Sequence, residues 1–119
     1  MSHSANDQLY LCLDQGGHSS RALVFNARGR QLYEARQPLL PEHSADGRIE
    51  YPADTLADSL RACVSDILRQ SRAQHSRLTA VALATQRSNI VCWDRHTGAA
   101  LSPIISWQDR RHARWLQQF

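Results

Sequence analysis

Residues 9–25 read LYLCLDQGGHSSRALVF, and this stretch decides the fold of the chain. Its first apolar segment ends at the carboxylate of Asp14, and a second apolar segment covers residues 22–25. A loop with two glycines and two serines separates the two segments. Two apolar segments joined by a glycine-containing loop are typical of a β-hairpin. We therefore predict antiparallel strands at about 9–13 and 21–25.

The loop of this hairpin has the composition of an anion-binding turn. Gly16 and Gly17 allow the backbone to turn tightly and to bring N–H groups close to a ligand. Successive N–H groups of that kind can form a concave site for phosphate oxygens. Ser19 and Ser20 add hydroxyl donors, and Arg21 adds a positive charge. The alternative is an ordinary hairpin turn, because Gly and Ser are common in turns of every function.

Asp14, just before the loop, is expected to serve a cation. A carboxylate repels a bare phosphate, whereas Mg²⁺ keeps several waters and takes one or two carboxylates together with substrate phosphates. We therefore expect Asp14 to hold Mg²⁺ through water. All 14 basic residues are arginine, which excludes a Walker-type lysine and Schiff-base chemistry. Backbone amides, hydroxyls and arginine must therefore bind any nucleotide phosphate.

Length and charge limit the class of protein. At 119 residues the chain is at most one domain, and 42% hydrophobic with 21% charged residues is ordinary for a globular protein. The net charge is +3, but the arginines are scattered and only Arg110, Arg111 and Arg114 cluster. No nucleic-acid-binding motif accompanies them, so we expect no nucleic-acid partner.

The cysteines and the first residues indicate the cellular compartment. Cys12, Cys63 and Cys92 lie far apart within apolar segments, so we expect free, buried thiols and no zinc site. Residues 1–8 are polar, lack the apolar core of a signal peptide and are expected to be disordered. No apolar segment is long enough to span a membrane. We therefore expect a cytoplasmic protein without a membrane partner.

The pattern of apolar residues predicts the next elements. After a turn at 26–29, we expect a third antiparallel strand at 31–36 and a loop at 37–48. Helical spacing predicts a helix at 53–71, with Pro52 at its start. The face that should pack on the sheet contains Leu56, Leu60, Cys63, Val64 and Ile67.

The last third of the chain alternates between extended and helical patterns. Residues 78–84, LTAVALA, predict a strand that is buried on both faces. It should be parallel to its neighbour, because a helix connects it to the hairpin. We then expect a short strand at 89–94, a turn at 95–98, an extended segment at 103–107 and a helix at 110–118 capped by Asp109.

Two further motifs follow the predicted strand at 78–84. Residues 84–89, ATQRSN, leave its carboxyl end, where ligands bind in open α/β sheets. Gln86 and Arg87 can there hydrogen-bond the hydroxyls of a polar ligand; the alternative is that Arg87 only caps the sheet. The second motif has two parts, VCWDRHTG at 91–98 and IISWQDRR at 104–111.

These motifs, together with DQGGHSSR at 14–21, resemble those of the FGGY carbohydrate kinases, the glycerol kinase branch especially, in order and spacing. The resemblance covers Leu9 to Phe119, which would be the N-terminal part of a family member. It implies an α/β fold, the ribonuclease H-like half-domain of the actin-like ATPase superfamily. Such a half-domain has a mixed sheet with an antiparallel meander, then a helix and a parallel strand. The order of predicted elements agrees with this fold, although periodicity alone does not single it out.

The resemblance also implies ligands and site residues. ATP and Mg²⁺ are the implied cofactors, and a small sugar or polyol is the implied substrate. Asp14 is implied near Mg²⁺. Arg87, Ser88 and Trp107 are expected at the substrate, with core packing as the alternative for Trp107. The nucleotide phosphates are expected at Gly16, Gly17, His18, Ser19, Ser20 and Arg21.

Two departures from the family pattern bear on the function. The usual family loop has two threonines where this chain has Gly17 and His18, which removes two hydroxyl donors. Glycerol kinases have a glutamate directly after the arginine, where this chain has Ser88. A hydroxyl cannot replace a carboxylate as a charged bidentate acceptor. We therefore expect a different polyol or a sugar rather than glycerol.

Other parts of a kinase have no counterpart in the sequence. Sugar phosphorylation needs a base near the attacking hydroxyl. In the family this base is an aspartate downstream of the motifs found here, and the second lobe, which holds the adenine, also lies outside them. We therefore expect an inactive fragment of an ATP-dependent carbohydrate kinase that forms homo-oligomers. The alternatives are a truncated, non-catalytic binding module and a fragment of another actin-like ATPase.

Overall fold

The computed structural model describes residues 8–72 and 77–119. They form two compact units. The first contains the chain up to Leu39 together with Leu56–Gln86, and the second contains Leu40–Thr55 together with Arg87–Phe119. Disorder was expected for residues 1–8; residues 1–7 lie outside the described residues, and the Gln8 side chain accepts the Tyr10 hydroxyl at 2.9 Å.

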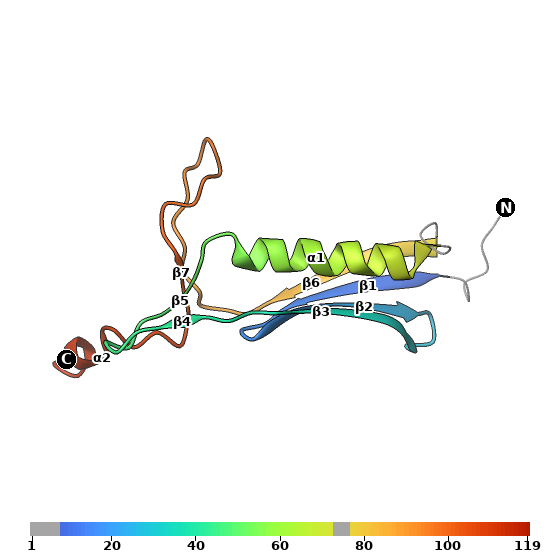
Figure 1. Ribbon diagram of the computed structural model, residues 1–119. Coiled ribbons are helices and arrows are strands. Elements are labelled where there is room, and N and C mark those ends of the chain that lie inside the picture. Colours follow the sequence, from blue (N-terminus) through green and yellow to red (C-terminus); the bar gives the residue numbers. More distant parts are fainter. Residues whose placement is uncertain (1–7, 73–76) are drawn as a thin grey trace. The chain divides into compact units, whose positions relative to one another are not determined.

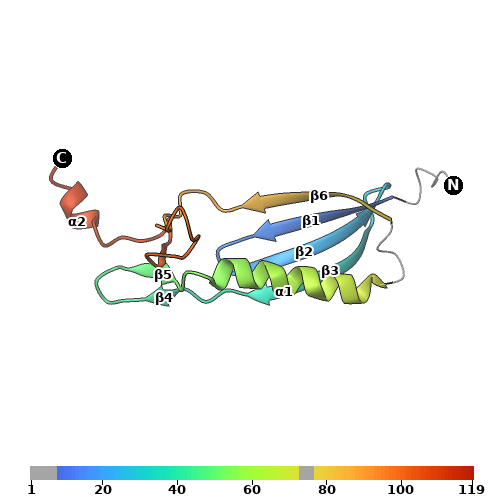
Figure 2. The ribbon, with the colours of Figure 1, turned by 90° about the horizontal axis from the view of Figure 1, so that it is seen from above.

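The first unit is built on a mixed sheet. Strands β1 (Leu9–Gln15), β2 (Ser19–Asn26) and β3 (Gln31–Pro38) form an antiparallel meander. Strand β6 (Leu78–Thr85) pairs with β1 in parallel, which gives the order β3-β2-β1-β6 (Figure 2). The predicted meander and the predicted parallel strand are therefore confirmed. The strands extend slightly beyond their predicted bounds, because polar residues beside the loop also join the ladder.

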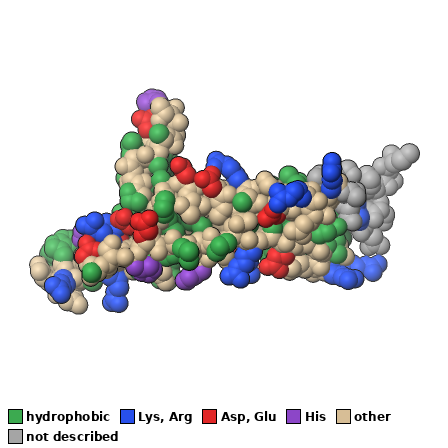
Figure 3. All heavy atoms as spheres, viewed as in Figure 1, with side chains coloured by type: hydrophobic (Ala, Val, Ile, Leu, Met, Phe, Trp, Pro, Cys, Tyr) green, Lys and Arg blue, Asp and Glu red, His purple; other side chains and the backbone are tan. Residues whose placement is uncertain are grey.

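Helix α1 (Thr55–Gln70) lies along one face of this sheet in both ribbon views (Figures 1 and 2). It begins slightly later than predicted, after a turn in which the Thr55 N–H donates to the Pro52 carbonyl at 3.0 Å. Acidic and basic side chains are both visible over α1 in Figure 3, on its solvent-exposed face. Its buried residues, Cys63 and Ile67, join a core cluster with Leu9, Leu11, Ala22, Val24 and Ala35.

The prediction that β6 is buried on both faces is wrong for this chain. Val81 and Leu83 are 62% and 57% exposed. They pair with Leu11 and Leu13 of β1, so they share the face that α1 covers elsewhere. β6 is the edge strand of the sheet, and the core cluster with α1 lies over β1, β2 and β3. An apolar sequence therefore identified the strand correctly but not its burial.

The second unit contains a small antiparallel sheet of order β4-β5-β7. Its strands are β4 (Glu42–His43), β5 (Ile49–Tyr51) and β7 (Ile104–Ile105). β4 lies within the stretch that was predicted to be loop, and β7 lies within the predicted extended segment. Tyr51 and Ile104, which face each other across β5 and β7, are buried.

The predicted strand at 89–94 is wrong. This stretch makes only isolated bridges, from Ile90 to Ile105 and from Trp93 to Ala100. Side chains take up backbone groups here: the Ser102 hydroxyl accepts the Cys92 N–H at 3.0 Å, and the Asp94 carboxylate accepts the N–H groups of His96 and Thr97 at 2.8 and 2.7 Å. Such local bonds favour turns over a ladder.

The predicted helix at 110–118 is wrong in extent and in its cap. Helix α2 covers only Ala113–Leu116, and His112 occupies the N-cap position. Asp109 Oδ1 does accept the Arg111 N–H at 3.1 Å, but Oδ2 accepts the Ile49 N–H of β5, and the helix begins only at Ala113. The local hydrogen bond of Asp109 therefore belongs to a turn and coexists with a tertiary one.

The three cysteines are free, as predicted, but they differ in burial. Cys63 is buried, Cys12 is half-buried, and Cys92 is exposed, which corrects the prediction for that residue. Among the described helices, none has the length and apolar character needed to span a membrane.

Candidate functional site

The loop between β1 and β2 is a tight turn at the carboxyl end of β1. Gln15 pairs with Ser20 across the hairpin, and the Gly16 N–H donates to the Ser19 carbonyl at 3.0 Å. A Cβ at Gly16 would stand 3.1 Å from that carbonyl oxygen, closer than ordinary van der Waals contact. Glycine is therefore needed here for close backbone approach. The Gly16 N–H is used within the turn, so other donors of the loop would have to bind an anion.

Asp14 and Arg21 are opposite each other in the β1–β2 register and form an ion pair. The Arg21 Nη2 and Nε atoms donate to Asp14 Oδ2 at 2.5 and 3.1 Å. The hydrogen bond to Asp14 raises the pKa of Arg21. Both side chains are partly exposed, at 45% for Arg21 and 37% for Asp14. Each group therefore neutralises the other at the mouth of the loop, where a cation and a phosphate could replace them as partners.

Ser20 does not lie at the loop surface with its neighbours. It is fully buried, and its hydroxyl lies 2.7 Å from the Ser59 hydroxyl of α1. Ser59 donates its proton to the Leu56 carbonyl at 2.7 Å, so Ser20 is the donor in the Ser20–Ser59 bond. The hydroxyl of Ser20 thus joins sheet to helix. Alternate strand residues point to opposite faces, which leaves Ser19 and Arg21 on the face away from α1.

His18 is exposed at the tip of the hairpin. Its carbonyl accepts the Leu39 N–H at 2.8 Å, which connects the tip to the end of β3. Of the residues predicted to bind phosphate, His18, Ser19 and Arg21 therefore have side chains that are at least partly accessible.

The side chains of two glutamines hydrogen-bond the backbone of the loop. The Gly16 carbonyl accepts Gln15 Nε2 at 2.7 Å and Gln86 Nε2 at 3.4 Å. The Gln86 N–H donates to the Gln15 carbonyl at 3.1 Å and extends the parallel β1–β6 ladder by one residue. From the sequence, Gln86 was expected to hydrogen-bond the hydroxyls of a polar ligand. The β1–β6 register places both glutamines beside the loop, but only the structure reveals that register.

Ser88 and Trp107 lie together in the second unit. A hollow of about 450 Å³ is lined by both and by Ile90, Ile105, Ser106, Asp109, Arg110, His112, Ala113 and Leu116. Trp107 is 58% exposed in this chain, so it is not a core residue. Its backbone N–H donates to Asn89 Oδ1 at 3.0 Å. Arg87 is exposed and does not line this hollow.

Ser88 has an uncommon backbone conformation. Its φ is +66°, and in the described ranges 8–72 and 77–119 it is the one non-glycine residue with positive φ. Such a conformation costs free energy for a residue with a Cβ, and it is often found at functional sites. The bend follows directly after Gln86 and Arg87, where the chain passes from the first unit to the second.

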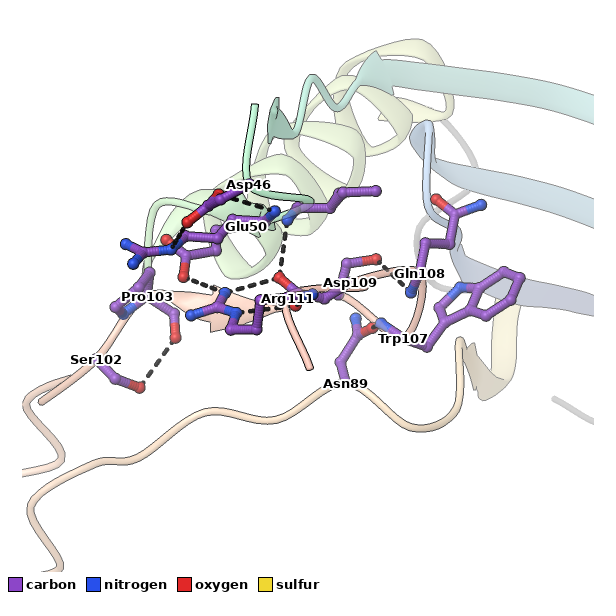
Figure 4. A network of polar contacts seen from close by, with 12 residues as sticks. Asp46, Glu50, Asn89, Ser102, Pro103, Trp107, Gln108, Asp109 and Arg111 are labelled. Carbon is purple, nitrogen blue, oxygen red and sulfur yellow. Dashed lines mark hydrogen bonds and ion pairs between the residues drawn. The ribbon is translucent and has the colours of Figure 1, made fainter. Parts of the chain in front are cut away.

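The segment that contains Trp107 is held to β5 by a network of charges (Figure 4). Asp109 Oδ2 accepts the Ile49 N–H at 2.8 Å and Arg111 Nη2 at 2.7 Å. Arg111 also pairs with Glu50, and all three side chains are largely buried. The hydrogen bond from Arg111 is the main reason that the pKa of Asp109 lies well below its ordinary value. Sequence reasoning missed this network, because its members are about sixty positions apart.

The predicted site residues therefore fall into two groups. The first unit brings together Asp14, Arg21 and the Gly/Ser loop, and the second unit brings together Ser88 and Trp107. Among the described residues there is no group of three or more His, Cys, Asp and Glu side chains that could hold a metal by itself. Mg²⁺ asks for fewer protein ligands, because it keeps several waters and also binds substrate phosphates, so a single carboxylate such as that of Asp14 meets its requirement.

Fold and loop together define the class of protein. Three antiparallel strands, a helix and a strand parallel to the first, with a Gly/Ser loop after β1, make the α/β fold of the ribonuclease H-like, actin-like ATPase superfamily. The model of the "FGGY family of carbohydrate kinases, N-terminal domain" matches residues 9–119. The chain therefore belongs to the FGGY family of carbohydrate kinases, as its motifs predicted.

Named relatives and solved structures agree with this assignment. The chain is 38% identical over 103 residues to a glycerol kinase of Alcanivorax borkumensis, covering 87% of this chain and 21% of that protein. It is 36% identical to a glycerol kinase of Acinetobacter baylyi, and the match covers 88% of this chain and 21% of that protein. A Plasmodium falciparum glycerol kinase with ADP superimposes with a TM-score of 0.80 at 19% identity, covering 94% and 22%. A Rhodospirillum rubrum xylulose kinase superimposes with a TM-score of 0.76 at 21% sequence identity, and the match covers 93% of this chain and 24% of that one. The chain thus spans about a fifth of the length of the curated relatives it matches.

Proposed function

We propose that this chain supplies the phosphate-binding loop and one wall of the substrate site of a carbohydrate kinase. The reaction is transfer of a phosphoryl group from ATP to a hydroxyl of a sugar or polyol. The observation that supports it most is the Asp14–Arg21 pair beside the Gly16 turn, at the carboxyl end of β1. Ligands of open α/β sheets bind at such ends.

Each residue of the loop has a distinct role in this proposal. Arg21 and the Ser19 hydroxyl bind phosphate oxygens, with His18 at the tip of the turn. Asp14 holds Mg²⁺ through water. When bound, Mg²⁺ neutralises charge on the phosphates and fixes their geometry. Gln15 and Gln86 fix the Gly16 carbonyl and so limit movement of the turn. Ser20 keeps the loop attached to α1 and binds no ligand.

The substrate side is assigned to the second unit. Trp107 offers an exposed aromatic face, and Ser88 offers a hydroxyl at the rim of the same hollow. Arg87, which follows the loop-supporting Gln86, adds a guanidinium for substrate hydroxyls. Without a carboxylate at position 88, glycerol loses a strong acceptor, and a larger polyol or a sugar is the preferred substrate class.

Neither aspartate of the later motifs is placed to act as a base for the attacking hydroxyl. Asp94 is bonded to its own turn, and Asp109 is saturated by Arg111 and the Ile49 N–H. Hydrogen bonds from the Thr97 and His96 N–H groups hold the pKa of Asp94 below its ordinary value. We therefore propose that the chain alone transfers no phosphoryl group. Residues equivalent to the other four fifths of its relatives would have to complete the site.

A chimera tests the role of Asp14. In it, residues 9–119 replace the matching segment of the Alcanivorax borkumensis glycerol kinase, and ADP release is measured with a panel of polyols and sugars. We expect Asp14→Asn to lower kcat by about 100-fold or more, because a group that positions transition-state charge is lost. Asp58→Asn, which removes a more exposed Arg–Asp pair on α1, should leave the rate unchanged. Equal rates for Asp14→Asn and the parent chimera would refute the assignment.

The same chimera tests Ser88 as a determinant of specificity. Ser88→Glu restores the carboxylate of glycerol kinases at the rim of the hollow. We expect kcat/KM for glycerol to rise by about tenfold or more, since a charge-assisted hydrogen bond is regained. If the parent chimera already prefers glycerol over all larger polyols and sugars, this interpretation of Ser88 is wrong.

A second candidate function is a non-catalytic binding module. The composition of the β1–β2 loop favours the binding module. Gly17 and His18 stand where the family loop has two threonines, so two hydroxyl donors for phosphate are missing. A chimera that folds and binds Mg-ADP but phosphorylates no compound of the panel, even as Ser88→Glu, would support the module over the kinase.

A further inference from the structure

A second hollow of the second unit has a different chemistry. It is an open hollow of about 480 Å³ beside the turn that joins β4 to β5. Its lining is Ala45, Asp46, Gly47, Arg110, Arg111, Ala113 and Arg114. It shares only Arg110 and Ala113 with the hollow of Ser88 and Trp107, and nothing in the proposed kinase reaction uses it.

The floor of this hollow is fixed by backbone contacts. The Arg110 N–H donates to the Gly47 carbonyl at 2.9 Å, and the Gly47 N–H donates to the Ser44 carbonyl at 3.1 Å. Gly47 has a φ of +89°, and a Cβ there would stand 3.3 Å from the Arg110 carbonyl carbon. Glycine at this position therefore permits both the turn and its close approach to Arg110.

The charges of the lining do not cancel. Arg111 is occupied by Asp109 and Glu50, and Asp46 pairs with Arg48 at 2.8 Å. The side chains of Arg110 and Arg114, by contrast, make no ion pair or hydrogen bond with any described residue. Figure 3 shows basic side chains gathered around α2. Two guanidinium groups, four positions apart, are thus left without an acceptor at one wall.

We propose that this hollow binds the phosphate group of a small phosphomonoester or of inorganic phosphate, held by Arg110 and Arg114. A guanidinium presents paired N–H donors that match phosphate oxygens, and two of them balance a dianion. The backbone N–H groups of Gly47, Arg110 and Arg111 are already bonded, so the side chains are the donors. The Asp46 carboxylate at the same hollow disfavours a ligand with several phosphates and can accept a hydroxyl of the ester.

The test uses the ¹⁵N-labelled 119-residue chain. Sodium phosphate and glycerol 3-phosphate are titrated separately at constant ionic strength, with amide shifts as the readout. We expect saturable shifts at residues 45–47 and 110–114. The Arg110→Gln and Arg114→Gln variants should each weaken binding by about tenfold, since each loses a charge-assisted hydrogen bond. Arg95→Gln, an exposed arginine of the same unit, is the matched control and should leave binding unchanged.

The outcomes separate the possible sources of phosphate. Tighter binding of glycerol 3-phosphate identifies a phosphomonoester site, and equal affinity identifies a site for phosphate itself. The proposal would be overturned if sodium chloride produced the same amide shifts as phosphate. It would also be overturned if Arg95→Gln weakened phosphate binding by the same factor as Arg110→Gln and Arg114→Gln. All three tryptophans lie in the second unit, so unchanged tryptophan fluorescence verifies that each variant is folded. An Arg21→Gln variant separates this site from the hairpin loop, because it should not alter these shifts.

Discussion

At the scale of single residues, the side chains around both predicted sites are held by charge pairs. Asp14 with Arg21 and Asp109 with Arg111 are the two clearest examples. The first pair is half exposed and can exchange partners with water and ligands at little cost. The second is largely buried, is joined by Glu50 and fixes a backbone segment. We therefore propose that the first pair binds ligand and that the second stabilises the fold.

The buried pair makes the second unit sensitive to acid. Because the folded pKa of Asp109 lies below its unfolded value of about 3.9, its stabilisation is complete above that pH. It is lost as the pH falls from about 4 toward the folded pKa. We expect the melting temperature, followed by tryptophan fluorescence, to fall in that window. The Asp109→Asn variant should have a lower melting temperature than the parent chain at pH 7. Its melting temperature should also change less as the pH falls below about 4.

The control for this prediction is Asp46→Asn, whose ion pair with Arg48 is exposed. It should retain the pH dependence of the parent chain. A parent chain and an Asp109→Asn variant with parallel pH profiles between pH 2.5 and 5 would show that Asp109 contributes no linked stability.

Residue types alone revealed part of the candidate site. The order Asp14, Gly16, Ser19, Arg21 predicted a turn after a strand, and the structure contains it. The burial of Ser20 could have been anticipated from strand alternation, which places neighbours on opposite faces. The contacts of Gln86 and Asp109 could not, because they join segments far apart in the sequence.

At the scale of elements, strong periodicity predicted the meander, α1 and β6 with small errors at the ends. The segments after Gln86 were predicted less well, because short strands and single turns there depend on tertiary contacts. Helix α2 is the clearest case, since Asp109 bonds both the Arg111 N–H and the Ile49 N–H of β5, and the helix starts only at Ala113. A local pattern cannot reveal the second of these hydrogen bonds, because it comes from a distant segment.

Strand β6 leads to a prediction about self-association. It is an eight-residue edge strand without charge or proline, and Val81 and Leu83 are exposed on it. Edges of this kind pair readily with another chain. We expect the 119-residue chain to associate with concentration in sedimentation velocity experiments, and Val81→Lys to shift it toward monomer.

A matched change on the helix serves as the control for β6. Leu68→Lys, at an exposed position of α1, adds the same charge to the first unit away from its edge strand. Association that Leu68→Lys weakens as much as Val81→Lys would mean that net charge, and not the strand edge, is responsible.

At the scale of the whole molecule, our proposal assigns a different role to each of the two units. The first unit contains the loop proposed for ATP and Mg²⁺, and the second contains the hollow with Trp107 and Ser88. The chain spans about a fifth of the length of its curated relatives. Our proposal is that turnover also needs residues that match the rest of those relatives, whereas ligand binding at the loop needs only residues of this chain.

The most direct test of this account is therefore a titration of the ¹⁵N-labelled chain with ADP, with and without Mg²⁺. We predict amide shifts centred on Gly16 to Arg21 that require Mg²⁺. Asp14→Asn should lose this requirement together with most of the affinity, because the carboxylate that accepts the hydrated ion is gone. Asp58→Asn should behave as the parent chain. Absence of shifts at these amides with Mg-ADP, or shifts that Asp14→Asn leaves unchanged, would contradict the assignment of this hairpin as a phosphate loop.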